Sequence, residues 1–282
     1  MSQVAIVTDS TAYIPKDIQE AHKIIVAPQV LIWGNETFRD GVDIQPEEFY
    51  TRLQKTTVMP TTSQVTIASF KEIFTHLLDE GNEVLAVLLS AKLSGTIDSA
   101  VQAREMLPGS PIEIVDSQTT AMALGYLALT AARAAEAGAS LSECRALAES
   151  GIPNTGVVFA VDTLEFLHRG GRIGGASRFL GTALKLKPIL EVTGGRVEAI
   201  ERVRTRSKSL ERVVDIIVER IAGRAPVRLA TLHANAPAEA RQILDMATAR
   251  LNVVESIISE ISPVVANHAG PGTVGLAFLA GM

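Results

Sequence analysis

The sequence has a single cysteine and few aromatic residues. Cys144 lies in the helical pattern SLSECRALAES, so no disulfide can form within the chain, and we expect a reducing compartment and a packing role for this side chain. Aromatic residues make up 4% of the sequence, which disfavours stacking platforms for single-stranded nucleic acid. The formal net charge is −5, and a general nucleic-acid binder would need a basic footprint instead.

Long apolar runs are also missing. The longest, AMALGYLALTAARAA, is too short and too rich in alanine to span a bilayer. An apolar strand begins at Val4, so we expect no signal peptide and a cytoplasmic protein. Hydrophobic residues nevertheless make up 47% of the 282 residues and charged residues 20%, which indicates a large core and leaves room for two domains.

Common nucleotide and metal motifs do not occur in the sequence. It contains neither GxxxxGK[ST] nor HExxH, and its five histidines show no metal-ligand spacing, so we expect no metal and no cofactor. Gly270, Gly272 and Gly275 match GxGxxG, but only seven residues follow Gly275, too few for the crossover helix of a dinucleotide loop. We interpret these glycines as a tight turn or a close approach to a bound group.

The first half alternates apolar strands with amphipathic helices. We expect strands at 4–7, 24–33, 83–90 and 112–117, and helices at 45–55, 66–81, 94–107 and 119–138. This alternation is typical of a parallel sheet with helices on both faces. Segment 36–44 predicts a hairpin or excursion that turns at Gly41.

The second half mixes a hairpin with helices. The hairpin is expected at 186–204 and turns at Gly194 and Gly195; it is followed by helices at 209–223 and 236–251 and strands at 227–234, 253–262 and 273–280. The sequence therefore predicts an α/β fold, with a parallel-sheet α/β domain over 1–160 and an α+β domain over 161–282.

Polar residues follow three of the predicted parallel strands, in the segments TDST, LLSAKLSGT and VDSQTT, where such sheets bind ligands. Ser94 in AKLSGT has two open interpretations. It is a helix N-cap, or it forms an anion site together with the N–H groups near Gly95 and Thr96. It is not a nucleophile elbow, because Lys92 stands where GxSxG requires glycine.

Three further segments have both a plain and a functional interpretation. PTTSQVT at 60–66 is a solvated cap or a second group of hydrogen-bond donors for an oxyanion. LHRGGRIGG at 167–175 is a flexible turn or a basic loop for an anionic ligand or an acidic partner. Arg202, Arg204 and Arg206 lie two residues apart, so a strand would present all three on one face, as a charged sheet edge or a docking surface.

Eight short motifs follow one another along nearly the whole chain. They are VTDSTAYIP at 7–15, TTSQ at 61–64, LSGT at 93–96, DS at 116–117, LHRGGRI at 167–173, LKPIL at 186–190, RTRSK at 204–208 and HAGPGTVG at 268–275. In order and spacing this series resembles the DegV family. The resemblance implies two α/β domains with a long-chain fatty acid between them, as in the fatty-acid-binding subunit of bacterial fatty acid kinase.

The resemblance also implies roles for single residues. Thr62 and Ser94 would bind the fatty-acid carboxylate, His268 would complete the hydrogen-bond network, and Gly95 and Thr96 belong to the same LSGT motif. The protein would be a carrier without catalysis of its own. A separate ATP-binding kinase subunit would phosphorylate the bound acid, and the acyl phosphate would feed phospholipid synthesis. The arginines that match the docking surface for that subunit are Arg172, Arg202, Arg204 and Arg206.

Physical chemistry permits such a carrier. Burying a methylene contributes roughly 0.8 kcal/mol, so a chain of about 16 carbons gains on the order of 12 kcal/mol before entropy costs. The carboxylate must be hydrogen-bonded, because a buried unpaired charge is very costly. Two alternatives are a serine hydrolase that uses Ser94 with His268 and Asp116 or Asp9, and a small-molecule phosphotransferase. The missing elbow and the missing nucleotide loop disfavour them.

Overall fold

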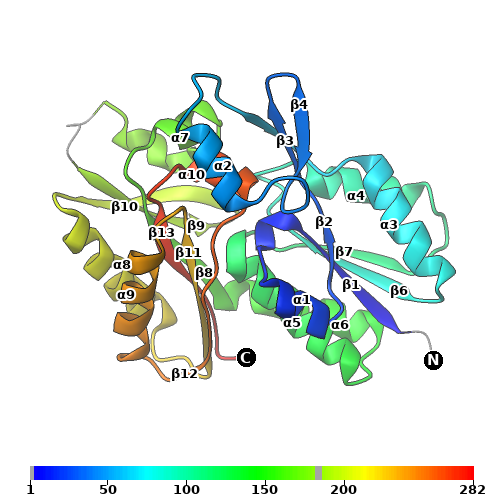
Figure 1. The fold of residues 1–282 in the computed structure, drawn as a ribbon. Coiled ribbons are helices and arrows are strands. Elements are labelled where there is room, and N and C mark those ends of the chain that lie inside the picture. The colour runs from blue at the N-terminus through cyan, green and yellow to red at the C-terminus, as the bar shows by residue number, and fades with distance from the viewer. Residues whose placement is uncertain (1–2, 182–185) are drawn as a thin grey trace.

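The computed structural model describes residues 3–181 and 186–282. Its first half is built on a parallel sheet of order β2-β1-β6-β7, as the alternating pattern predicts. The strands are β1 (Val4–Asp9), β2 (Ile25–Ala27), β6 (Glu83–Leu88) and β7 (Ile112–Asp116). One face packs against α3 (Ile67–Asp79) and α4 (Thr96–Glu105), and the other against α1 (Lys16–Ala21), α5 (Ala121–Glu136) and α6 (Leu141–Gly151) (Figure 1).

The second half is built on a six-stranded sheet of order β10-β9-β8-β13-β11-β12, in which only the β11–β12 pair is parallel. The strands are β8 (Thr155–Ala160), β9 (Lys187–Thr193), β10 (Arg196–Val203), β11 (Val227–His233), β12 (Val253–Ile257) and β13 (Val274–Ala280). Helices α8 (Arg206–Ile221) and α9 (Pro237–Thr248) cover its outer face (Figure 1).

A third, small sheet has the order β4-β3-β5 and lies beside helix α2 (Pro46–Leu53). Its strands are β3 (Val30–Trp33), β4 (Glu36–Arg39) and β5 (Thr61–Ser63). The hairpin of this sheet turns at Gly34, so segment 36–44 is not itself a hairpin. The predicted turn at Gly41 is confirmed: Gly41 begins a turn after β4 that is bridged by Asp40 and Ile44. The single strand predicted over 24–33 is divided between two sheets, because Pro28 has no N–H for a sheet ladder.

Short helices connect these layers. They are α7 (Glu165–Arg169) and α10 (Pro263–Ala269), with 3-10 turns η1 (Ser10–Ala12), η2 (Ile152–Asn154) and η3 (Gly174–Phe179). Helix α10 was not predicted: the strand expected over 253–262 ends at Ile257, and Ser262 caps a helix that has Pro263 at its first position.

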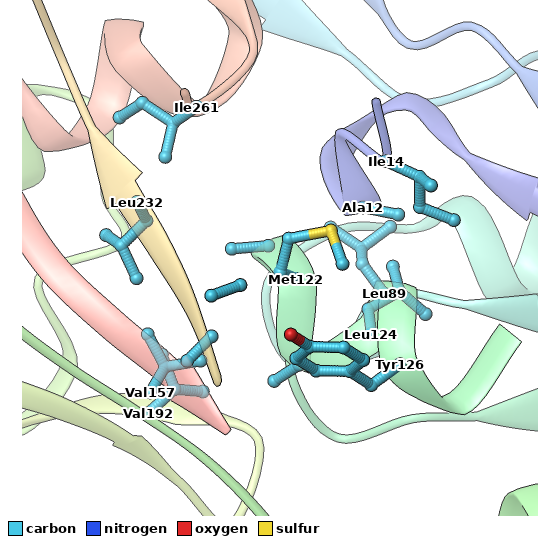
Figure 2. Close-up of a cluster of buried hydrophobic side chains, with 14 of the residues drawn as sticks. Ala12, Ile14, Leu89, Met122, Leu124, Tyr126, Val157, Val192, Leu232 and Ile261 are labelled. Carbon is cyan, nitrogen blue, oxygen red and sulfur yellow. The ribbon is translucent and has the colours of Figure 1, made fainter. Parts of the chain in front are cut away.

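Helix α5 lies between the two halves and is buried along most of its length. It packs against β1 and β6 of the first sheet and against β8, β11 and β13 of the second. In Figure 2 a group of side chains from the first half, which includes Ala12, Leu89 and Met122, faces Val157, Val192, Leu232 and Ile261 of the second half. One continuous core therefore joins both sheets.

The sheets divide the chain slightly earlier than expected. Strand β8 falls within the range 1–160 of the expected first domain, but it pairs with β9 and β13 in the second sheet. By sheet membership, the second half therefore begins before Thr155.

Candidate functional site

A cavity of about 200 Å³ lies between the two sheets. Much of its wall is aliphatic and comes from both halves, including Leu89, Leu93, Val157, Val192, Leu232 and Ile261. Polar side chains contribute the rest, among them Thr62, Ser94, Arg172 and His268. The cavity is therefore suited to a ligand with a long apolar part and a polar group at one position.

Thr62 and His268 join the two halves at this cavity. The Thr62 Oγ1 atom lies 2.8 Å from His268 Nε2, although the residues are 206 positions apart in the sequence. Thr62 is on β5, which pairs with β3, and His268 is on the last turn of α10. Gly170 allows this arrangement, because a Cβ atom there would overlap the imidazole ring.

His268 is neutral at pH 7. Burial, and then the positive charge of Arg172, lower the pKa of His268 to about 4. Its buried Nδ1 atom has no hydrogen-bond partner among the described residues. When a neutral His268 carries its proton on Nε2, it donates to Thr62 Oγ1 and leaves the Thr62 hydroxyl proton free for a ligand.

Ser94 lies in the loop between β6 and α4, and its Oγ is 2.9 Å from Thr96 Oγ1. Thr96 Oγ1 also accepts a hydrogen bond of 2.9 Å from Gln29 Nε2. The N-cap residue of α4 is Gly95, so the interpretation of Ser94 as the N-cap was wrong. No side chain caps this helix, which leaves its first N–H groups close to Ser94.

Gly95 and Thr96 lie behind the cavity wall. Thr96 is fully buried and supports Ser94, and neither residue is part of the lining. A Cβ atom at Gly95 would overlap the amide of Gln64, whose Nε2 donates to Ser99 Oγ over 3.0 Å. Strand β5 carries Thr62, and Gln64 follows this strand. Gly95 therefore lets Gln64 pack against the start of α4.

Arg172, expected on a docking surface, lies in the cavity wall. Its Nε donates to the Leu93 carbonyl over 3.0 Å, and its NH1 group donates to the Gly170 carbonyl over 2.7 Å. The guanidinium therefore holds the Gly-rich loop against the residue before Ser94. It also supplies positive charge beside His268.

The expectation that Arg202, Arg204 and Arg206 share one strand face was wrong, because β10 ends at Val203 and Arg206 begins α8. Arg202 lies over the Phe179 ring at 4.5 Å, and Arg204 is exposed. Arg206 binds Glu239 of α9 and the Gly272 carbonyl.

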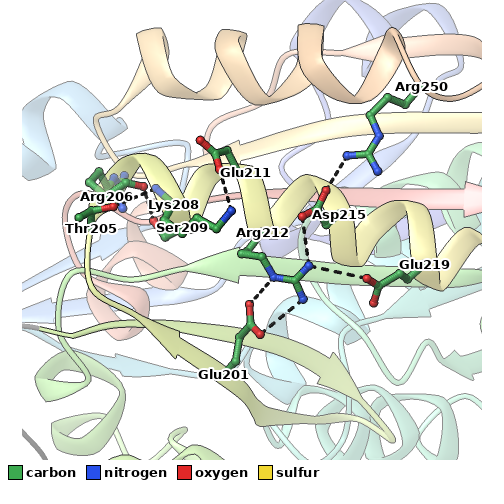
Figure 3. A network of polar contacts seen from close by, with 10 residues as sticks. All are labelled: Glu201, Thr205, Arg206, Lys208, Ser209, Glu211, Arg212, Asp215, Glu219 and Arg250. Atoms are coloured by element: carbon green, nitrogen blue, oxygen red, sulfur yellow. Dashed lines mark hydrogen bonds and ion pairs between the residues drawn. The ribbon is translucent and has the colours of Figure 1, made fainter.

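Farther along α8, charged side chains form a network of ion pairs (Figure 3). Arg212 bonds Glu201 of β10 and Asp215, and Asp215 also bonds Arg250 at the end of α9. These contacts fix α8 on the outer face of the second sheet.

Further polar residues line the cavity besides the predicted site residues. They are Gln29, Gln64 of the TTSQ motif, and Thr11 and Thr120, which follow strands β1 and β7. The polar strand ends TDST and VDSQTT did indicate the two threonines. Gln29 gave no signal, because it lies within an apolar run that resembles one strand.

The described residues do not form the relay of a serine hydrolase. Ser94 is hydrogen-bonded to Thr96, and His268 is hydrogen-bonded to Thr62. Asp9 accepts from Thr11 and Leu89 N, while Asp116 accepts from the backbone of Ala91 and Gln118. Neither carboxylate orients His268, as a Ser–His–Asp relay requires.

A second cavity, of about 250 Å³, is also lined by Thr62 and His268. It shares Thr62, Arg172 and His268 with the first cavity and adds Arg169, Met59 and Phe166. We call it the vestibule. Three polar residues of the main cavity therefore also line the vestibule.

The described residues contain neither a cluster of metal-ligating side chains nor a helix that could span a membrane. Within residues 3–181 and 186–282, no three histidine, cysteine, aspartate or glutamate side chains gather as metal ligands would. In the same part of the chain, no helix is both long enough and apolar enough to cross a bilayer.

The chain is similar to known proteins over nearly its whole length. The family model described as "Uncharacterised protein, DegV family" matches residues 3–281. A DegV domain-containing protein of Streptomyces coelicolor is 40% identical over 275 residues, which is 97% of each chain.

Solved structures match over the same length. The structure described as "Fatty Acid Binding of a DegV family Protein from Thermus thermophilus" has a TM-score of 0.93, 35% identity and 99% coverage of both chains. That of DegV from Bacillus subtilis, described as a fatty acid binding protein, has a TM-score of 0.89 at 33% identity and covers 99% of this chain and 100% of its own. The chain thus belongs to the DegV family.

Proposed function

We propose that this protein binds a long-chain fatty acid, with the tail in the aliphatic cavity and the carboxylate at Thr62, Ser94 and His268. The observation that carries the proposal is the Thr62–His268 hydrogen bond in the wall of an otherwise largely aliphatic cavity. The fatty-acid binding described for the Thermus thermophilus and Bacillus subtilis relatives supports it.

The head-group chemistry favours a carboxylate. Thr62 and Ser94 each offer a hydroxyl donor, and their oxygens are already held by His268 and Thr96. The guanidinium of Arg172 lies in the same wall and favours an anion over a neutral group. Together these groups offset the cost of moving a carboxylate out of water.

The tail chemistry favours a saturated or unsaturated hydrocarbon chain. Leu, Ile and Val side chains from both halves of the chain form most of the apolar part of the wall and offer no hydrogen bonds. Each buried methylene contributes about 0.8 kcal/mol, so tail burial supplies most of the binding free energy. The carboxylate contacts then decide which lipid class is preferred.

The same proposal includes presentation of the bound acid to a separate ATP-dependent kinase subunit, without catalysis by this chain. The vestibule supports it, because Thr62 and His268 line this second cavity as well, together with Arg169 and Arg172. Mixing the loaded protein with ATP and a candidate kinase subunit, and trapping acyl phosphate with hydroxylamine, tests this part. Absence of the hydroxamate with every candidate kinase contradicts it.

The binding proposal is tested on delipidated protein with palmitic acid and hexadecanol, which differ only in the head group. We expect the wild type to bind the acid more tightly, and Thr62→Val with Ser94→Ala to lower acid affinity by about tenfold or more. Hexadecanol affinity should change little. Thr61→Val, on the exposed neighbouring position of β5, is the matched control. Equal binding of both ligands by the wild type would falsify the carboxylate site.

A further inference from the structure

Asp40 is a buried carboxylate that lies outside the cavity wall. It follows strand β4 and is 1% exposed. Its Oδ2 atom accepts a hydrogen bond of 2.6 Å from Ser10 Oγ, and its Oδ1 atom accepts one of 3.1 Å from the backbone N–H of Val264. The side chain of Ser262 forms a further hydrogen bond with it. Asp40 therefore joins the segment after β1 to the start of α10.

The first connection fixes helix α10. Pro263 has no N–H, Val264 N donates to Asp40, and Val265 N donates to Ser262 Oγ over 3.3 Å. The first turn is thus bonded to Asp40 and to the N-cap residue. A helix of seven residues has little stability of its own, so its position depends on such anchors. His268 lies on the last turn of this helix and bonds Thr62.

The second connection leads to Ser94 through buried polar groups. Ser10 Oγ accepts from Gln29 N over 3.0 Å, and Gln29 Nε2 donates to Thr96 Oγ1 over 2.9 Å. Thr96 Oγ1 lies 2.9 Å from Ser94 Oγ. An amide NH2 group can only donate, so Thr96 Oγ1 uses one lone pair for Gln29 and keeps its own proton to donate. When Thr96 donates this proton to Ser94 Oγ, the Ser94 proton is free for a ligand.

We propose that Asp40 is a positioning residue of the head-group site: one buried carboxylate holds His268, through the start of α10, and Ser94, through Ser10, Gln29 and Thr96. The inference rests on the proposed fatty-acid binding. Retaining an acid here has a cost, because burial raises the pKa of Asp40 to about 6. The three hydrogen bonds to the carboxylate offset part of that cost.

The test compares palmitic acid with hexadecanol on delipidated Asp40→Ala, Asp40→Asn and Ser10→Ala proteins. We expect Asp40→Ala to reduce the preference for the acid by about tenfold while hexadecanol affinity stays within about twofold. Ser10→Ala cuts only the connection to Ser94 and should have a smaller effect. Asp43→Asn is the control, because this acid lies three residues away and, within residues 3–181 and 186–282, its carboxylate bonds Arg39 alone. It should retain the wild-type preference.

Three results would overturn the inference. The first is an unchanged acid preference in Asp40→Ala. The second is an equal loss for acid and alcohol, which indicates a general packing role. If Asp40→Ala does not fold, the third is an unchanged preference in both Asp40→Asn and Ser10→Ala. Failure of the proposed function itself is distinguishable, because the wild type would then show no preference for the acid before any substitution is made.

Discussion

At the scale of single residues, the site depends on groups whose charge and proton positions are fixed by burial. His268 stays neutral because burial and Arg172 both disfavour its protonated form. The resemblance to the DegV family located Thr62, Ser94 and His268, and the structure places all three on one cavity. The resemblance did not indicate Gln29 or Asp40, because the contacts of these two residues depend on segments that are distant in the sequence.

The neutral state of His268 predicts a pH dependence of stability. In the unfolded state His268 binds a proton below about pH 6.5, whereas in the folded state His268 does so only near pH 4. The contribution of the neutral imidazole is therefore present above pH 6.5 and is lost as the pH falls toward 4, by on the order of 1–3 kcal/mol.

Urea unfolding of wild type and His268→Gln at pH 7 and pH 4.5 measures this contribution. The wild type should lose more stability than the variant, and the comparison cancels the opposite contribution of Asp40, whose raised pKa makes it favour lower pH. Identical losses in the two proteins would show that His268 is not held neutral by the fold.

Arg206 and Arg204 differ in what they contact. Arg206 bonds Glu239 and the Gly272 carbonyl, whereas no hydrogen bond or ion pair joins Arg204 to another described residue. Arg206→Ala should lower the free energy of unfolding by about 2 kcal/mol, and Arg204→Ala by less than about 0.5 kcal/mol. Denaturant midpoints check this. Equal small effects would mean that Arg206 is free for docking.

At the scale of secondary-structure elements, short pieces carry most of the site. Strand β5 and helix α10 position Thr62 and His268, yet neither was predicted as an element. Both are too short for periodicity to show, and their partners β3 and Asp40 come from elsewhere in the chain. The long helices α3 and α5 and the hairpin over 186–204 were predicted correctly, because their patterns are local.

The β9–β10 hairpin fastens the two halves beside the cavity. Its turn accepts hydrogen bonds from the first half: Ser90 Oγ donates to Gly195 O over 2.8 Å and Lys92 Nζ donates to Gly194 O over 2.6 Å. The hairpin also contributes Val192 and Val197 to the lining. It therefore covers part of the cavity that we propose for the tail.

Loosening this hairpin should speed ligand release. We expect Ser90→Ala with Lys92→Met to raise the dissociation rate of bound palmitic acid by about 3- to 10-fold. Stopped-flow transfer of the acid to albumin measures the rate. Thr193→Ala, on the exposed side of the same hairpin, is the control. A rate unchanged from wild type would show that the turn does not limit release.

At the scale of the whole molecule, one core and one cavity are shared by both sheets. Composition and strand pattern predicted the parallel sheet and the mixed second half. Strand β8 pairs with β13 of the second sheet, so the two halves divide before Thr155. The cavity itself could not be predicted from pattern alone, because its aliphatic lining consists of the same residue types that build the core.

A shared core predicts cooperative unfolding. The fluorescence of Trp33, the single tryptophan, reports on the small sheet, and far-UV circular dichroism reports on both halves. Both signals should follow one transition, and palmitic acid at 100 times its Kd should stabilise the protein by about 2.7 kcal/mol. Two separated transitions would contradict a continuous core.

The proposed function requires that this chain hold a long-chain fatty acid by its carboxylate between the two sheets. Native mass spectrometry of the purified protein, followed by organic extraction and lipid analysis, is the decisive experiment. We expect one fatty acid per chain, lost in the Thr62→Ala/Ser94→Ala double variant. A ligand-free mass that stays unchanged after incubation with several fatty acids would contradict it.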